Sequence, residues 1–509
     1  MFHRTYSSMV GWGAACIMLA ACSNSTPTAS EPTSQTYDLV IENGRVMDPE
    51  TVLDAVKTIG VSDGRIAAIS DTGLDGETVI DASGMVVAPG FIDIHSHSPT
   101  PLGAKYQVLD GVTTQLDLEA GAFPVNAYGF MINGQSPLNF GNSVSHLAVR
   151  TKVIEGREQP YLFTQDGPMK PGAAFVKTAT AEQIDEMRAL LIEGLDQGGL
   201  GIGVLLDYIS TAVSEEELRM VFEVADERSA PVTVHVRRGL PGDPAGLIEV
   251  IELAEQTGAA LLICHITHSA MQALPQWLTL IDAANARGAK ITTETLSYAA
   301  GGTTIGAAVF HRDWQKIFNI TYEDVQWTAT GEWLTEETFK AYQAAEPSGM
   351  INHHYVKEEW VEAAIRWPGM MVSSDVTPAI TEDVLSNPNL AGTFARFIGH
   401  YARDRQQVSI MDALAKVSLY PAKWLAQSAP EFERKGRIQI GMDADIVIFD
   451  LASLKAKADY GAPYRASEGI KVVIVGGVPV ARDGALIAGA APGKHILAGK
   501  RQLFPQILP

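Results

Sequence analysis

The chain has 509 residues, of which 46% are hydrophobic and 19% are charged, a composition typical of a globular protein with a large core. The length allows one large domain or two or three ordinary ones. The formal net charge of −21 argues against a nucleic-acid partner, because the phosphates would be repelled.

The first residues have the pattern of an export signal. The apolar stretch over residues 9–21 is shorter than the roughly 20 apolar residues that a membrane span needs. It ends in Leu19-Ala20-Ala21-Cys22, which resembles the lipobox of bacterial lipoprotein signal peptides. We predict a signal peptide over residues 1–21, a lipid on Cys22, and a flexible tether over residues 22–36, rich in Ser, Thr and Pro.

This pattern predicts an exported protein of the cell envelope, in the periplasm or at the outer membrane. The lipid on Cys22 would be its only contact with the membrane. The alternative is a soluble secreted protein with an ordinary cleavage site.

Both ends of the remaining chain have the pattern of short β-strands. Alternating segments follow Tyr37, and Asp63-Gly64 between two apolar runs is a strong hairpin signal. Similar strands return after Gly436. We therefore predict one small β-sandwich domain built from residues 37–89 and 431–509.

Residues 90–430 alternate between strand-like apolar runs and helical patterns. Repeated β–α units of this size imply a parallel sheet with crossover helices. No GxGxxG segment or P-loop opens a helix, so the usual sign of nucleotide binding is missing. We predict an α/β fold in which these residues form a (β/α)₈ TIM barrel.

Residues that can bind a metal follow several of the predicted strands. His95 and His97 follow the run Phe91 to Ile94, and because side chains alternate along a strand, the two imidazoles point the same way. Three further apolar runs end in His235, His265 and Asp375. Catalytic residues of such barrels cluster where the strands end. The pattern predicts a metal site made by these five side chains; the alternative for His95 and His97 alone is a surface loop.

The chain resembles the amidohydrolase superfamily and, within it, the N-acyl-D-amino-acid deacylase (D-aminoacylase) branch. The strongest points of resemblance are residues 89–97 (PGFIDIHSH), 111–114 (GVTT), 234–237 (VHVR) and 436–445. The resemblance implies a distorted TIM barrel that holds one or two divalent metal ions, usually Zn²⁺, and a small β-sandwich made by both chain ends. It also implies metal-dependent hydrolysis of the amide C–N bond of a small molecule, with N-acyl-D-amino acids as the expected substrates.

The ligand that would bridge two metal ions departs from the family pattern. D-aminoacylases typically carry a Cys in a Gly-Asn-Cys-Gly segment, whereas residues 111–121 of this chain contain none. Glu119 is the predicted replacement, since some superfamily members use a bridging Glu, and Asp117 on the same strand face is the alternative. In this resemblance Asp375 is both a metal ligand and the catalytic proton shuttle.

The candidates for substrate binding are Arg237, Tyr298, His268 and His146. Arg237 lies two residues after His235 and could pair with a substrate carboxylate, with a structural ion pair as the alternative. Tyr298 matches a Pro-Tyr segment of the family near the scissile carbonyl, and His146 is expected to support the site. The family often has a substrate-binding Lys where this chain has Thr267, so His268 or Arg237 takes that task or the substrate differs.

The segment from His311 to His354 is long and rich in Trp and Glu, as in loops that cap a pocket. The pair His353-His354 is expected at the surface or in this lid.

Two other functions compete with deacylation. A cyclic amidase such as a hydantoinase, or a D-dipeptidase, of the same superfamily usually relies on a carboxylated Lys, and no predicted strand ends in such a Lys. An envelope lipoprotein that binds metal without catalysis would not need the carboxylate of Asp375.

Overall fold

The computed structural model describes residue 1 and residues 35–499, except 130–131, 133–134 and 165–166. The predicted signal peptide over residues 1–21 lies outside the described residues apart from Met1, as do Cys22 and most of the predicted tether over residues 22–36. The described residues from 36 to 499 form one compact unit.

Eight parallel strands form the barrel wall, and the predicted (β/α)₈ barrel is confirmed. In spatial order they are β6 (Phe91–Asp93), β7 (Val112–Ala122), β8 (Asn139–Ser145), β11 (Ile202–Leu205), β12 (Val232–His235), β13 (Leu261–Ile263), β14 (Ile291–Leu296) and β19 (Met371–Ser373). The first and last strands are joined just beyond their ends. There the Asp375 amide donates to the His95 carbonyl (2.7 Å) and the His97 amide donates to the Val376 carbonyl (3.0 Å).

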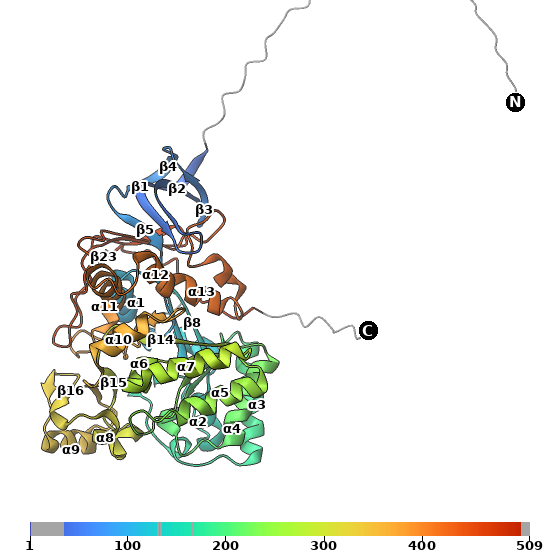
Figure 1. Cartoon of the computed structure of the whole chain (residues 1–509), viewed down its shortest axis with the longest axis vertical. Coiled ribbons are helices and arrows are strands. Elements are labelled where there is room, and N and C mark those ends of the chain that lie inside the picture. The colour runs from blue at the N-terminus through green and yellow to red at the C-terminus, as the bar shows by residue number, and fades with distance from the viewer. Residues whose placement is uncertain (2–34, 130–131, 133–134, 165–166, 500–509) are drawn as a thin grey trace, which may run out of the picture. The chain divides into compact units, whose positions relative to one another are not determined.

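Helices cross over between the barrel strands (Figure 1). They are α1 (Pro101–Leu109), α2 (His146–Glu155), α3 (Ala181–Asp196), α4 (Glu215–Glu227), α5 (Ala245–Thr257), α6 (Ile266–Ala270), α7 (Leu274–Ala286) and α10 (Glu358–Ile365). After β19 follow α11 (Asn389–Arg396), η7 (Phe397–Asp404), α12 (Ile410–Leu414), η8 (Ala415–Leu419) and α13 (Tyr420–Leu425). Local sequence sets where these helices begin: at α3, Thr180 and Gln183 form a capping box that satisfies the free amides of the first turn.

Short elements complete the barrel loops. They are η1 (Val125–Gly129), β9 (Phe163–Thr164), β10 (Gly167–Pro168), η2 (Ala173–Phe175), η3 (Leu206–Ile209), η4 (Met271–Ala273) and η9 (Pro430–Arg434). Of these, η3 directly continues β11 and carries Asp207 and Tyr208 to the end of the barrel where the strands finish.

An insertion between β14 and β19 builds a small sheet of its own, in the order β15–β18–β16–β17. Its elements are β15 (Gly301–Thr304), η5 (Ala308–His311), α8 (Trp314–Phe318), η6 (Tyr322–Asp324), β16 (Val325–Trp327), β17 (Glu332–Trp333), α9 (Glu336–Ala345) and β18 (Met350–His353). Two contacts join the insertion to η3: Tyr208 Oη lies 2.8 Å from Thr303 Oγ1, and Arg312 Nη1 lies 3.2 Å from Asp207 Oδ1. Of the two places expected for the pair, the surface or the segment 311–354 as a lid, the surface does not hold for His353: it is buried in β18, because its ring packs on Phe318 and Tyr355.

The two chain ends together form a nine-stranded sheet, as predicted. Its strands are β1 (Thr36–Asp48), β2 (Leu53–Ser62), β3 (Arg65–Ser70), β4 (Asp75–Asp81), β5 (Val86–Pro89), β20 (Ile446–Phe449), β21 (Ile470–Val475), β22 (Val478–Arg482) and β23 (Ala485–Leu486). The predicted hairpin joins β2 to β3, and Asp63 and Gly64 both have positive φ (51° and 72°), as its tight turn requires. The domain bounds 37–89, 90–430 and 431–509 stay a prediction.

Within the described part of the chain, no helix has both the length and the apolar character needed to cross a bilayer.

Candidate metal centre

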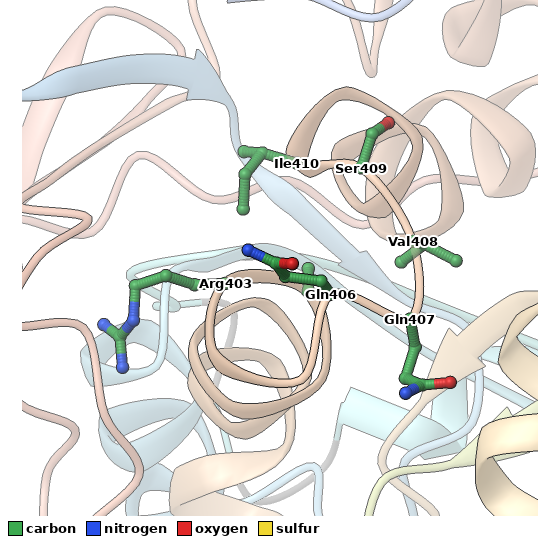
Figure 2. Close-up of a pocket in the computed structure, with 7 residues that line it drawn as sticks. Arg403, Gln406, Gln407, Val408, Ser409 and Ile410 are labelled. Carbon is green, nitrogen blue, oxygen red and sulfur yellow. The ribbon is translucent and has the colours of Figure 1, made fainter.

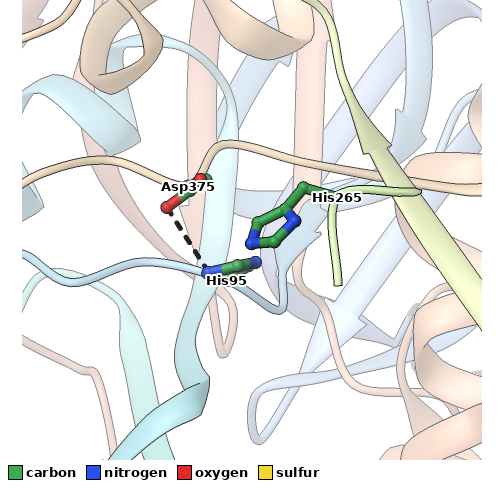
Figure 3. Close-up of side chains that lie close together, drawn as sticks. All are labelled: His95, His265 and Asp375. Atoms are coloured by element: carbon green, nitrogen blue, oxygen red, sulfur yellow. Dashed lines mark ion pairs between the residues drawn. The ribbon is translucent and has the colours of Figure 1, made fainter. Parts of the chain in front are cut away.

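Six side chains meet where the barrel strands end. They are His95 and His97 after β6, Glu119 in β7, His235 at the end of β12, His265 after β13 and Asp375 after β19. The side chains of the five other than Asp375 are at most 9% exposed, whereas that of Asp375 is 17% exposed. Figure 3 shows His95, His265 and Asp375 converging from three separate segments of the chain. Asp375 is thus the member of the group that water and a substrate reach most easily.

The first set of donor atoms lies around one oxygen of Glu119. The Nε2 atoms of His95 and His97 are 3.1 Å apart, and they lie 3.2 and 3.3 Å from Glu119 Oε2. Asp375 Oδ1 is 3.4 Å from both Nε2 atoms. The two Nε2 atoms therefore lie within 3.4 Å of both carboxylates.

The second set lies around the other oxygen of the same carboxylate. Glu119 Oε1 is 3.0 Å from His235 Nδ1 and 3.0 Å from His265 Nε2, and these two nitrogen atoms are 3.0 Å apart. The carboxylate of Glu119 therefore joins the two histidine pairs, one through each oxygen.

The spacing of these donors fits tetrahedral zinc. With metal–ligand bonds of about 2.0–2.1 Å, the donor atoms of a tetrahedron stand roughly 3.3 Å apart, close to the 3.0–3.4 Å within each set. Imidazole nitrogen and carboxylate oxygen are also donors that Zn²⁺ accepts in proteins. The residues present could hold one or two divalent ions.

Backbone conformation brings these donors together. Glu119 lies where the pairing of β7 with β8 shifts register, between Asp117 and Ala122. Gly203 of β11 allows this bulge to come close, since a Cβ atom there would stand 2.2 Å from the Glu119 carbonyl oxygen. His265 (φ 30°) and Asp375 (φ 48°) both adopt left-handed backbone, a strained conformation that is often found at functional sites.

Two buried carboxylates hold the first histidine pair in place. His97 Nδ1 lies 2.9 Å from Asp117 Oδ2, which also accepts a hydrogen bond from Tyr161 Oη (2.6 Å). His95 Nδ1 lies 3.0 Å from Glu294 Oε1. Each contact fixes which nitrogen of the imidazole faces the donor set. Asp117, the alternative to Glu119, therefore lies behind His97 rather than between the two pairs.

The electrostatics of the group favour a cation. Burial opposes the ionisation of Glu119, but the charge of His95 and the hydrogen bonds from His235 and His265 outweigh it, so the pKa of Glu119 is well below its usual value. The pKa of Asp375 is also lowered, because His95 and His97 outweigh the effect of burial. Two ionised carboxylates in a buried setting require compensating positive charge.

The structure does not bring three of the predicted substrate-binding residues to these donors. Arg237 pairs with Glu249 of α5 (2.9 Å), because β12 ends at His235 and the strand alternation does not continue beyond it. Tyr298 donates a hydrogen bond to the Ala458 carbonyl (3.0 Å), and the buried His146 pairs with Glu217 of α4 (2.9 Å).

His268 is the predicted substrate-binding residue that does lie beside the group. Its ring centroid is 6.3 Å from that of His265, and neither of its buried ring nitrogen atoms has a hydrogen-bond partner. Thr267 faces Thr295 instead, and their hydroxyl groups form a hydrogen bond.

Two residues of the site had not been predicted from the sequence. Glu294 lies in β14 (Ile291–Leu296), and its position on the inner face of that strand was the available signal. Arg238 directly follows Arg237, and the local sequence does not indicate which of the two arginines would face the site.

A surface depression lies elsewhere, between η7 and α12 (Figure 2). Its labelled lining residues are Arg403, Gln406, Gln407, Val408, Ser409 and Ile410. Arg403 is bound by Asp404 and by the carbonyl oxygen of Leu451, and none of the six metal donors lines this depression.

Comparison with known proteins gives a consistent result. The model of the Amidohydrolase family matches residues 78–481. An N-acyl-D-glutamate deacylase of Alcaligenes xylosoxydans xylosoxydans is 28% identical over 473 residues, which cover 87% of this chain and 93% of the relative. A D-aminoacylase of the same organism is 26% identical over 498 residues, which cover 89% and 96%.

A solved structure shares the fold. The crystal structure of N-acyl-D-glutamate deacylase from Bordetella bronchiseptica, complexed with zinc and a phosphonate inhibitor, has a TM-score of 0.76 at 24% identity. The match covers 91% of this chain and 100% of that one. These findings confirm the resemblance that the sequence motifs indicated.

Proposed function

Because the chain belongs to the amidohydrolase family, we propose that it is a metal-dependent hydrolase that removes the acyl group from N-acyl-D-amino acids. The observation that carries this proposal is the carboxylate of Glu119, whose two oxygens face two histidine pairs beside the partly exposed Asp375. An N-acyl-D-glutamate deacylase and a D-aminoacylase both match over nearly the whole chain, which supports the choice of substrate.

We assign the two donor sets to Zn²⁺. One ion would be held by His95, His97, Asp375 and Glu119 Oε2, and a second by His235, His265 and Glu119 Oε1. A divalent ion bound at these residues supplies Lewis acidity, which polarises a carbonyl group and lowers the pKa of water to about 7.

The residues of the chain supply the proton transfers. Asp375, ionised and accessible, accepts a proton from the attacking water as the new C–O bond forms. The same carboxyl group then donates that proton to the amide nitrogen as the C–N bond breaks. The products are a carboxylic acid and a free amino acid, so one water is consumed and the proton on Asp375 is returned.

The donor set does not favour a cyclic amidase or a D-dipeptidase with a carboxylated Lys. The position between the two histidine pairs, where a carboxylated Lys would lie, is taken by the carboxylate of Glu119. A protein that only bound metal would have no use for an accessible carboxylate at this point.

The activity is tested with a panel of N-acetyl-D-amino acids, N-acetyl-L-amino acids and dipeptides. The zinc-loaded protein is expected to release free amine from the N-acetyl-D-amino acids, and a chelator should abolish this release. A protein that carries stoichiometric zinc but hydrolyses none of the panel would overturn the proposal.

We also propose that the protein is exported and anchored by a lipid on Cys22. The support is the sequence Leu19-Ala20-Ala21-Cys22 followed by a Ser- and Pro-rich stretch. Expression of the wild type and of Cys22→Ser tests this proposal. The wild type should fractionate with membranes and incorporate labelled palmitate, whereas equal behaviour of the two would contradict it.

A further inference from the structure

The backbone of Arg238 is held by hydrogen bonds, whereas the Nε atom of its guanidinium group forms none. It follows β12 by three residues, its amide donates to Asp207 Oδ1 (2.9 Å), and its carbonyl accepts a hydrogen bond from Arg312. The side chain is partly buried, and its buried Nε atom has no hydrogen-bond partner.

The neighbouring arginines are paired with acids, unlike Arg238. Arg237 Nε lies 2.9 Å from Glu249, and Arg312 Nη1 lies 3.2 Å from Asp207. Among the residues that the structure describes, no acidic side chain forms an ion pair with Arg238. A buried guanidinium Nε atom without a hydrogen-bond acceptor is costly, and the carboxylate of Asp207 nearby is already paired with Arg312, so this position favours an anionic ligand.

The surroundings of Arg238 connect it to the metal centre. Its guanidinium carbon lies 5.2 Å from the ring centroid of Phe318, which is 4.6 Å from that of Tyr355. Tyr355 Oη donates to the His268 carbonyl (3.0 Å), and the His268 ring lies beside His265. The residues between Arg238 and the donors are thus aromatic rings and imidazoles.

The buried histidine of the insertion on this side carries no charge of its own. Burial, together with the positive charge of Arg238, lowers the pKa of His353. Near neutral pH the positive charge beside these aromatic residues therefore comes from the guanidinium of Arg238.

We propose that Arg238 binds the α-carboxylate of the substrate, and that the preferred substrates carry this one carboxylate and an uncharged side chain. The inference rests on the proposed deacylase function for the rest of the substrate. A planar guanidinium can bind a carboxylate through two hydrogen bonds. Among the described residues around Phe318 and Tyr355, Arg238 is the cation without an acidic partner, so we expect no second carboxylate to be bound there.

The experiment compares an acid with its neutral analogue. For the zinc-loaded wild type, kcat/KM is measured with N-acetyl-D-phenylalanine and with its carboxamide, and then for Arg238→Met, Arg238→Lys and the control Arg237→Met. Arg238→Met should lose on the order of 10²-fold on the acid and change little on the carboxamide. Arg238→Lys should retain part of the preference for the acid over the carboxamide. Arg237→Met should retain the full preference of the wild type.

An equal loss of kcat/KM on the acid and the carboxamide in Arg238→Met would overturn the assignment. A kcat/KM for N-acetyl-D-glutamate that matched or exceeded that for N-acetyl-D-phenylalanine would overturn the single-carboxylate preference. Zinc content and melting temperature, measured for each variant, identify any that fails to fold. If Arg238→Met does not fold, the assignment is tested by whether Arg238→Lys retains part of the preference for the acid.

A binding measurement separates this inference from the proposed function. N-ethyl-D-phenylalanine has no acyl carbonyl to hydrolyse, and its affinity and that of its carboxamide are measured by calorimetry on the zinc-loaded protein. If no N-acyl amino acid is hydrolysed but the acid binds better than the carboxamide only when Arg238 is present, the deacylase proposal fails and the carboxylate site stands. If hydrolysis occurs but the acid and the carboxamide bind equally well, the deacylase proposal stands and the carboxylate site at Arg238 fails.

Discussion

Glu119 Oε1 lies 3.0 Å from His265 Nε2, while the second oxygen of the same carboxylate faces the other histidine pair. One side chain of β7 thereby joins donors from opposite parts of the barrel wall. The number of metal ions that the protein holds should therefore depend on this carboxylate.

Glu119→Gln replaces one donor oxygen by an amide NH₂ group, which cannot bind a metal ion. We expect the zinc content, measured by mass spectrometry after gel filtration, to fall by at least one ion per chain. Glu217→Gln is a matched control, since it also removes a buried carboxylate, but one that pairs with Arg150 and His146. It should lower stability and keep the zinc content; unchanged zinc in Glu119→Gln would contradict the bridging role.

Asp375→Asn removes the proposed proton acceptor and preserves the local backbone, because Asn also tolerates the left-handed conformation (φ 48°) found there. General acid–base catalysis contributes roughly 10²–10⁴-fold, and kcat should fall by about this factor. The zinc content should remain, since Asn keeps one side-chain oxygen as a donor and the histidines and Glu119 are unchanged. Full activity in this variant would rule out the assigned role.

Asp117→Asn weakens the contact that orients His97. Loss of such a partner of a metal-binding histidine typically lowers metal affinity by about 10–100-fold, and we expect a change of this size in a chelator competition assay. Tyr161→Phe removes only the second hydrogen bond to the same Asp117 oxygen and should have a smaller effect. Equal affinities in Asp117→Asn and the wild type would show that this contact does not matter.

Glu50 makes the sheet of the chain ends sensitive to acid. Hydrogen bonds from Arg437, and further ones from Lys423 and Gln439, outweigh burial and lower the pKa of Glu50 from 4.5 to about 2. Its ionised form therefore stabilises the fold above pH 4.5, and this contribution is lost as the pH falls toward 2. With a side-chain exposure of 32%, it amounts to on the order of 1–2 kcal/mol.

Glu50→Gln should accordingly lower the free energy of unfolding at pH 7, and the difference from the wild type should shrink between pH 5 and pH 3. Denaturant titrations at pH 7, 5 and 3 measure this. The exposed Glu77 serves as the control position, and Glu77→Gln is expected to have no such effect. A deficit in Glu50→Gln that stayed constant with pH would contradict the assignment.

The convergence of several site residues could be predicted from the sequence, because it depends on where each residue lies along its own strand. Side chains alternate along a strand, and parallel strands of a barrel end at the same place. These two facts were enough to expect His95, His97, His235, His265 and Asp375 near one another. Side-chain alternation predicts orientation only as far as the last residue of a strand. Arg237 lies two residues beyond β12, and its side chain pairs with Glu249 instead of pointing to the site.

By itself the sequence determined the barrel, the sheet shared by both chain ends and the convergence of the candidate donor side chains, since these follow from the period of apolar residues and from strand order. Only the tertiary structure decided that Glu119 lies between the histidine pairs while Asp117 lies behind His97. It also decided that Arg238, not Arg237, is the arginine left without an acid. These choices depend on which groups from distant segments share a buried space, and no local pattern encodes the distance between such groups.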